Sequence, residues 1–140
     1  MRAGRLRSWG DGCRCSTWRL ESFYRRYLER CNDHHFDRLG EFVADDVEVN
    51  GELQGLPGYI AGLQAAVCAF PDYRWDLRHL LVDGDWLAAH FIDTGTHTGT
   101  FLGVPATGRI VSSQEFAVYR VVADKIVEVR VSADNMSPLR

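Results

Sequence analysis

The sequence predicts an α+β fold in which three helices cover one face of an antiparallel sheet. In the first half of the 140-residue chain, apolar residues recur at three- and four-residue steps, which is typical of amphipathic helices. In the second half they alternate with polar residues, which is typical of strands with one buried face. Because the strands follow one another without intervening helices, we expect hairpin pairing rather than crossovers. The length fits one domain.

The helical pattern falls into three segments. The first helix is predicted from Thr17 to Cys31 and a short second one from Phe36 to Val43, ended by Asp45-Asp46 and followed by a strand over 47–51. The third begins near Pro57, whose fixed φ suits a first helical turn, and stops at Pro71. Their buried stripes are Leu20, Phe23, Tyr24, Tyr27, Leu28 and Cys31; then Phe36, Leu39, Phe42 and Val43; then Tyr59, Ile60, Leu63, Val67 and Phe70.

Four strands are predicted after the helices. The first alternates from Tyr73 to Leu81, and Asp83-Gly84-Asp85 is a tight turn into a second strand that runs to about residue 100. A loop over 102–108 leads to a third strand over 110–122, and Ala123-Asp124 turns into the last, over 125–132. The sheet therefore ends the domain, which we place at residues 17–136.

Composition narrows the classes of function. The net charge of −3 argues against a nucleic-acid surface, and no apolar run approaches the ~20 residues of a membrane span. Residues 1–16 lack apolar periodicity and are interpreted as a disordered tail or an upstream start site. Cys13, Cys15, Cys31 and Cys68 show neither a disulfide framework nor metal-ligand spacing, and Cys31 and Cys68 are expected to be buried on helices. We expect a reduced, cytoplasmic protein without metal or cofactor.

One stretch resembles a known family. Residues 95–109 read GTHTGTFLGVPATGR and are similar to the glycine- and threonine-rich segment of SnoaL-like polyketide cyclases, also called ester cyclases; Phe70-Pro71-Asp72 and the segment 119–128 add further matches. The resemblance covers about residues 20–135. It implies the nuclear transport factor 2-like fold, a cone-shaped barrel in which a strongly curved antiparallel sheet wraps around three helices.

The resemblance also implies a function. Family members close a ring of aromatic polyketides by intramolecular aldol condensation without a cofactor, and a close branch is linked to hydroxylation. A final-strand Asp serves there as the acid–base residue, and the corresponding position in this chain is Val131. Asp134 matches a second family Asp, and Ala117 replaces a family His. The resemblance further implies a small apolar or aromatic ligand and a homodimer formed through the outer face of the sheet, for which Leu80, Val82 and Val118 are candidates.

Strand alternation indicates which side chains share the pocket. Ser113, Glu115, Ala117 and Tyr119 fall on one face, as do Asp93, Gly95 and His97 on the preceding strand. Glu115 is our candidate base, because an apolar site raises the pKa of a carboxyl into the useful range, with His97 or Tyr119 as the proton donor. Asp134 is a third candidate catalytic residue. The expected pocket residues are Asp93, Tyr119, Val131, Trp75, Tyr59 and Tyr27.

Simpler readings remain open. His97 can hold the following loop through hydrogen bonds, Glu115 can form a surface ion pair with Arg109 or Arg120, and Asp93 can be solvated. Two other functions also remain open: a non-catalytic small-molecule-binding cone, which the replacement at Val131 favours, and an epoxide hydrolase-like enzyme that uses Asp93, Arg109 and Asp134.

Overall fold

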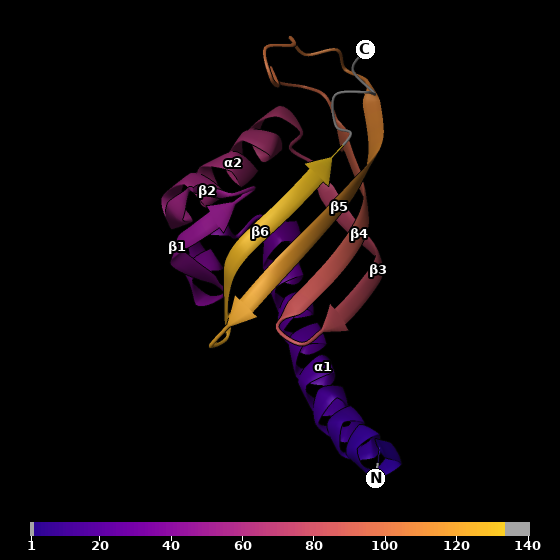
Figure 1. Ribbon diagram of the computed structural model, residues 1–140. Helices are drawn as coiled ribbons and strands as arrows, with labels where there is room; N and C mark the ends of the chain where they lie inside the picture. The colour runs from indigo at the N-terminus through magenta and orange to yellow at the C-terminus, as the bar shows by residue number, and fades with distance from the viewer. Residues whose placement is uncertain (1, 134–140) are drawn as a thin grey trace.

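Six strands form one curved sheet in the order β2-β1-β6-β5-β4-β3 (Figure 1). The computed structural model describes residues 2–133, and of residues 2–16 only the backbone. In chain order the elements are α1 Arg2–Asn32, the 3-10 helix η1 Phe36–Glu41, β1 Val43–Val49, β2 Glu52–Leu53, α2 Gly55–Ala69, β3 Arg74–Asp83, β4 Trp86–Thr96, β5 Ile110–Val122 and β6 Lys125–Ala133.

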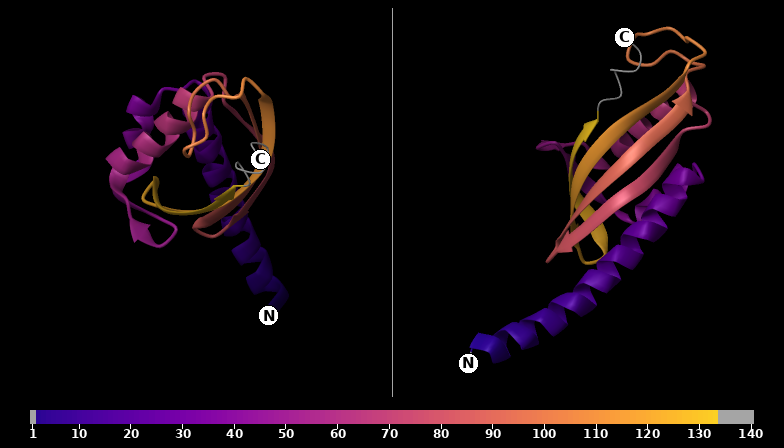
Figure 2. Two further views of the ribbon diagram at one scale, coloured as in Figure 1. Left: turned by 90° about the horizontal axis from the view of Figure 1, so that it is seen from above. Right: turned by 90° about the vertical axis from the view of Figure 1, so that its right-hand side faces the viewer.

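The four long strands pair as the antiparallel hairpins that the sequence predicts. β1, however, pairs in parallel with β6, so the sheet is mixed and not wholly antiparallel. Tight turns fix the neighbours of consecutive strands only, and β1 has no such turn to β6. Seen from above, the sheet curves around α1 and α2 without closing, which gives the expected cone shape (Figure 2).

The early part of the chain differs from the prediction in two places. Helix α1 begins at Arg2 and not near Thr17; the predicted disordered tail falls on residues whose side chains lie outside the described ones. The second helix is a single 3-10 segment ending at Glu41, and Asp45 and Asp46 do not terminate it but lie inside β1. A register shift between Val43 and Glu48 accommodates these two acidic residues at the surface.

The core fills the space between the concave face of the sheet and the helices. Tyr24, Leu39, Leu87 and Ile126 are almost completely buried, and the predicted stripe of α1 faces this core. Burial of an aromatic side chain such as Tyr24 contributes on the order of 2 kcal/mol to folding. Cys31 is buried as expected, whereas Cys68 is exposed, contrary to the prediction, near the C-terminal end of α2.

A bulge in β3 changes which residues face outward. Leu77 pairs with Phe91 and His79 with His90, so Arg78 is an extra residue in the strand. Side chains beyond it exchange faces, because alternation restarts after a bulge. Leu80 and Val82 therefore pack against the core and cannot supply the outer-face surface predicted for them, while Leu81 is 70% exposed.

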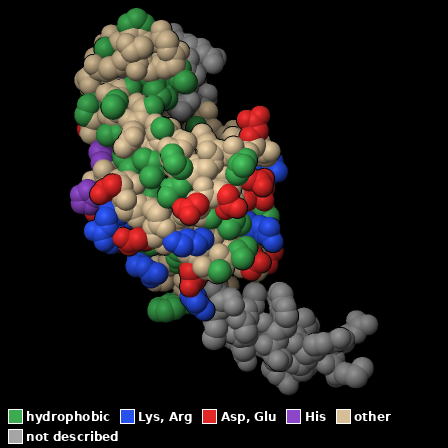
Figure 3. Space-filling view, turned by 90° about the vertical axis from the view of Figure 1, so that its left-hand side faces the viewer, with side chains coloured by type: hydrophobic (Ala, Val, Ile, Leu, Met, Phe, Trp, Pro, Cys, Tyr) green, Lys and Arg blue, Asp and Glu red, His purple; other side chains and the backbone are tan. Residues whose placement is uncertain are grey.

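On the face that carries α2 and β1, acidic and basic side chains are interspersed (Figure 3). No field of one sign dominates there. Across the helices that the structure describes, none is both long and apolar enough to cross a membrane.

Candidate functional site

A cavity of about 100 Å³ lies between the helices and the sheet, and we call it the inner cavity. Helices α1 and α2 supply one wall, and β3 to β6 supply the other. Aromatic and aliphatic side chains form most of the lining, and Glu115 is the one carboxyl among the residues that form it. The lining residues are Tyr24, Tyr27, Leu28, Cys31, Tyr59, Leu63, Trp75, Phe91, Glu115, Tyr119, Val129 and Val131.

The structure thus brings most of the predicted pocket residues together: Tyr27, Tyr59, Trp75, Tyr119 and Val131 all line the inner cavity, with Glu115. Asp93 lies next to Glu115 without lining the cavity. Asp134 lies outside the described residues.

Tyrosine hydroxyls give the inner cavity its neutral polar groups. The hydroxyls of Tyr27 and Tyr59 form a short buried hydrogen bond, which joins α1 to α2 across the cavity. The Tyr24 hydroxyl is buried with no partner among the described residues. Burial raises the pKa of Tyr24, Tyr27, Tyr59 and Tyr119, so all four stay protonated. One of the Tyr27 and Tyr59 hydroxyls donates to the other, which leaves the remaining hydroxyls as candidate donors to a ligand.

Glu115 is a carboxyl in an apolar setting. Desolvation is the main cause that raises its pKa to about 9, and hydrogen bonding to Asp93 and the charge of Asp93 add to the shift. The indole N–H of Trp75 acts in the opposite direction. Glu115 is therefore mostly protonated at pH 7. Neither Arg109 nor Arg120 pairs with it among the ion pairs of the described residues, so the surface ion-pair reading is not supported.

Asp93 is the more buried carboxyl of the pair that it forms with Glu115. It is 2% exposed, so the reading of a solvated residue does not hold. The Tyr73 hydroxyl donates to Oδ2 of Asp93 at 3.0 Å, and Oδ1 is buried without a partner. Desolvation raises the pKa of Asp93, while hydrogen bonds from Glu115 and Tyr73 lower it. Two desolvated carboxyls that interact cannot both ionise readily, and since the pKa of Glu115 is raised to about 9 the pair holds a proton on Glu115 at pH 7.

His97 lies elsewhere, in the loop that follows β4. Its Nδ1 accepts a hydrogen bond from the Thr107 backbone N–H at 3.3 Å and lies 2.9 Å from the Thr107 hydroxyl. Its backbone bonds to Arg109 and Gly108. The ring stacks on Phe70 with centroids 5.2 Å apart, and His97 is not among the residues that line the inner cavity. This geometry supports the interpretation that His97 holds the following loop through hydrogen bonds.

The sequence does not predict the contacts of two further residues. The alternation predicts Tyr73 only as a strand residue, although it alternates with Trp75 and so shares the inner face. Asp72 holds the end of β4, accepting hydrogen bonds from the Thr96 backbone and hydroxyl at 2.7 and 2.8 Å. Arg109 is exposed, so the structure does not gather it with Asp93 into an epoxide-opening set. Within the described residues, no cluster of three or more His, Cys, Asp or Glu side chains could hold a metal ion.

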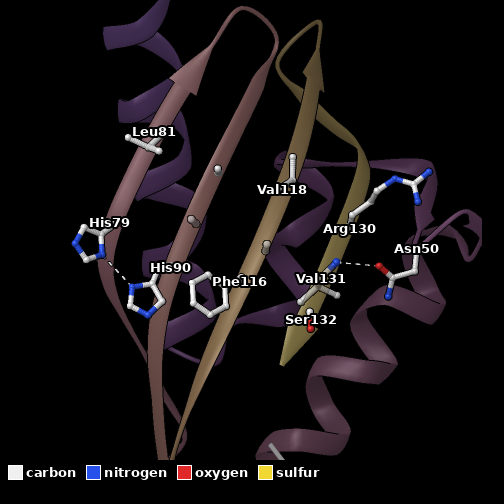
Figure 4. A pocket seen from close by; sticks show the side chains of 12 residues that line it. Asn50, His79, Leu81, His90, Phe116, Val118, Arg130, Val131 and Ser132 are labelled. Atoms are coloured by element: carbon white, nitrogen blue, oxygen red, sulfur yellow. Dashed lines mark hydrogen bonds between the residues drawn. The ribbon is translucent and has the colours of Figure 1, made fainter. Parts of the chain in front are cut away.

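A second hollow lies on the outer face of the sheet, with the helices behind it (Figure 4). This outer groove has a volume of about 750 Å³, and its floor includes Leu81, Phe116 and Val118. His79 and His90 form a hydrogen bond between their Nδ1 atoms at 2.9 Å along one side, and Arg130 lies on the other. Among the residues that the structure describes, no carboxyl lines it. The outer groove is larger than the inner cavity, and its candidate bases are the two imidazoles, which are engaged with each other and, for His90, with Gln114 at 2.9 Å.

Comparisons with known proteins agree with this architecture. The family described as SnoaL-like polyketide cyclase matches residues 21–140. The aklanonic acid methyl ester cyclases DauD of Streptomyces sp. strain C5 and DnrD of Streptomyces peucetius are each 29% identical over 124 residues, covering 83% of this chain and 76% and 85% of their own lengths. A SnoaL-like polyketide cyclase structure from Agrobacterium tumefaciens is 35% identical, with a TM-score of 0.77, and the match covers 84% of this chain and 93% of that one. The chain therefore belongs to the SnoaL-like polyketide cyclase family.

Proposed function

We propose that this protein closes a ring in a small apolar carbonyl compound by acid–base catalysis without a cofactor, and that Glu115 is the residue that moves the proton. The observation that carries the proposal is the interacting carboxyl pair of partly buried Glu115 and buried Asp93 at the wall of an aromatic cavity. A carboxyl with a raised pKa is a stronger base when it is ionised, and it is matched to proton abstraction next to a carbonyl. The aromatic lining suits an apolar ligand.

The proposed reaction is an intramolecular aldol condensation. Ionised Glu115 takes the proton from a carbon next to a carbonyl, and the Tyr119 hydroxyl donates a hydrogen bond to the oxygen of the enolate that forms. The enolate carbon then attacks a second carbonyl of the same molecule and forms the new carbon–carbon bond. Glu115 returns its proton to the resulting alkoxide, so no proton or electron is gained or lost.

Glu115 replaces the function of an acid–base residue on the neighbouring strand. Val131 on β6 pairs with Ala117 on β5, and Glu115 lies two residues from Ala117 on the same face. Both Val131 and Glu115 line the inner cavity. A ligand held over Val131 is therefore within the same small space as the Glu115 carboxyl, and the role can move from one strand to the next.

The test uses aklanonic acid methyl ester, the compound named for the DauD and DnrD relatives. Product formation is followed by chromatography with purified wild type, Glu115→Gln and the exposed control Glu52→Gln. We expect turnover by the wild type and the control, and a loss of at least ~100-fold in Glu115→Gln with ligand binding retained. Unchanged turnover in Glu115→Gln would exclude Glu115 as the proton-transfer residue.

A non-catalytic binding cone is the second candidate function. The apolar Val131 at the family's acid–base position favours it. In that case wild type and Glu115→Gln bind the compound equally and neither converts it.

We also propose a homodimer formed through the outer groove. Phe116 is 56% exposed and Val118 38% exposed there, beside Leu81. These residues replace the pair Leu80 and Val82, which the bulge in β3 turns toward the core. A second copy that covers this floor would remove exposed aromatic and aliphatic surface from water.

A further inference from the structure

A surface groove lies next to the inner cavity, and two side chains separate the groove from the cavity. A groove of about 320 Å³, which we call the side groove, runs between α1 and the start of β3. Leu28 and Trp75 line both the side groove and the inner cavity. The other residues of the side groove are Arg25, Glu29, Asn32, Asp33, Arg74, Asp76 and Leu77.

The backbone of Trp75 is fixed by hydrogen bonds, whereas its side chain, which is 7% exposed, is held by ring packing and by the indole N–H that acts on Glu115. The Asn32 side chain donates to the Trp75 carbonyl at 2.9 Å and accepts from the Trp75 N–H at 2.8 Å. The indole ring contacts the rings of Tyr73 and Phe36, with centroids 4.6 and 6.4 Å apart. Rotation about the side-chain torsions of Trp75 would break these side-chain contacts, but it would join the two hollows and leave both backbone hydrogen bonds to Asn32 in place.

The size of the inner cavity makes such a connection necessary for a large ligand. At about 100 Å³ it is smaller than the roughly 150 Å³ cavity that holds one benzene ring. A fused-ring compound cannot be contained in it while Trp75 and Leu28 keep their places. The side groove offers about three times that space directly beyond them.

Charge limits what the side groove can hold. It contains the carboxylates of Glu29, Asp33 and Asp76 and the guanidinium groups of Arg25 and Arg74. Arg25 is paired with Glu21 at 3.2 Å, and Asp76 with Arg78 at 3.0 Å. No excess of positive charge remains to neutralise an anionic ligand, so an uncharged polar group is favoured over an anionic one at this end.

We propose that Trp75 is the gate through which an uncharged fused-ring ligand enters, with one ring reaching Glu115 in the inner cavity and its polar end lying in the side groove. This inference rests on the proposed function for the identity of the inner site. It assigns to Trp75 control over ligand size and to the side groove control over ligand charge. Glu29, exposed on α1, borders the mouth of this path.

The test compares the association rates of quinizarin, an uncharged three-ring compound, and phenol, a single ring, by stopped-flow fluorescence. Trp75→Ala should raise the ratio of the quinizarin rate to the phenol rate at least ~5-fold, and Glu29→Trp, which fills the side groove from outside, should lower it at least ~10-fold. Trp75→Phe should give an intermediate increase. Arg26→Trp is the matched control, because Arg26 is exposed on the same helix but borders a different groove.

The charge preference is tested with an anionic analogue. Quinizarin sulfonate should bind at least ~10-fold more weakly than quinizarin.

The gate is refuted if Glu29→Trp and the Trp75 variants leave the ratio within twofold of the wild type. A Phe116→Ala variant that loses quinizarin binding would place the ligand on the outer face and also overturn the proposal. Equal affinity for the sulfonate would refute the charge preference. These binding measurements need no turnover, so they test the entrance independently of the proposed reaction. Full activity in Glu115→Gln would refute the proposed reaction, whereas blocked quinizarin association in Glu29→Trp would still support the entrance.

Discussion

The hydroxyl of Tyr73 donates to Oδ2 of Asp93 at 3.0 Å, and Oδ1 of the same carboxyl is buried without a partner among the described residues. The tyrosine thus stabilises the charge on Asp93, which is the direction in which its hydrogen bond moves the pKa of that carboxyl. A charged Asp93 in turn raises the pKa of Glu115. The hydrogen bond from Tyr73 therefore acts through the Asp93 carboxyl on the pKa of Glu115 at the cavity wall.

Replacing Asp93 should shift the pH dependence of turnover. In wild type, activity that depends on ionised Glu115 rises with pH until about 9, the pKa of that carboxyl. Asp93→Asn removes the charge that adds to this shift, so we expect the rising limb of the kcat profile to move to lower pH by about one unit. The control Asp85→Asn, in an exposed turn, should leave the profile in place. An identical profile in Asp93→Asn would show that the two carboxyls do not interact.

Glu115 should also make the protein less stable as pH rises. Its folded-state pKa of about 9 exceeds the ordinary value of 4.5, so between these two pH values the native state keeps a proton that the unfolded state releases. The stabilising effect of the neutral carboxyl is complete below about pH 4.5 and is lost progressively as pH increases. Between pH 5.5 and 7.5 this amounts to on the order of 2 kcal/mol in the free energy of unfolding.

Urea denaturation at these two pH values would measure this effect. Glu115→Gln has no proton to lose, so it should be more stable than wild type at pH 7.5 and differ much less at pH 5.5. A stability difference that is the same at both pH values would mean that Glu115 ionises as an ordinary surface carboxyl.

The strand pattern predicted much of this fold. β5 has the predicted bounds, 110–122, because its alternation is regular and its side chains face a continuous core. β3 shows where prediction from strand alternation fails. Arg78 is an extra residue in this strand, and no residue type marks a bulge of this kind. The polarity of Asp45 and Asp46 predicts a helix end, but β1 tolerates both residues because they lie at the surface.

The candidate site was predicted as a set of residues rather than as an arrangement. Glu115 and Asp93 were both placed on inner faces, yet their pairing depends on the register of β4 against β5, where Asp93 opposes Ser113 and Phe91 opposes Glu115. A long loop joins these strands, so no turn type fixes that register in advance. His97 shares the inner face with Asp93, but Phe70 packs over Gly95 between them, and only tertiary packing reveals that separation.

Gly95, the single glycine of β4, should therefore resist replacement. A Cβ at this position would lie 2.9 Å from Cβ of Phe70, so the aromatic ring that stacks on His97 would have to move. We expect Gly95→Ala to lower the free energy of unfolding by about 1–3 kcal/mol. Gly62→Ala is the matched control, since a Cβ there meets nothing within 4 Å, and in helix α2 it should stabilise by about 0.5–1 kcal/mol. Urea denaturation of both variants checks the opposite signs, and destabilisation by both would contradict the packing argument.

The outer groove should determine the oligomeric state. In a symmetric dimer through this face, Phe116 of one copy packs against the same surface of its partner, so Phe116→Glu would bring buried charge into the interface. We expect the dissociation constant of the dimer to rise at least ~10-fold, which light scattering at micromolar concentration would detect as a shift toward the monomer mass. Ile110→Glu is the control, because Ile110 is 83% exposed on the same strand but does not line the groove. A wild type that is already monomeric at this concentration would refute the proposed dimer, and equal dissociation by both variants would place the interface elsewhere on β5.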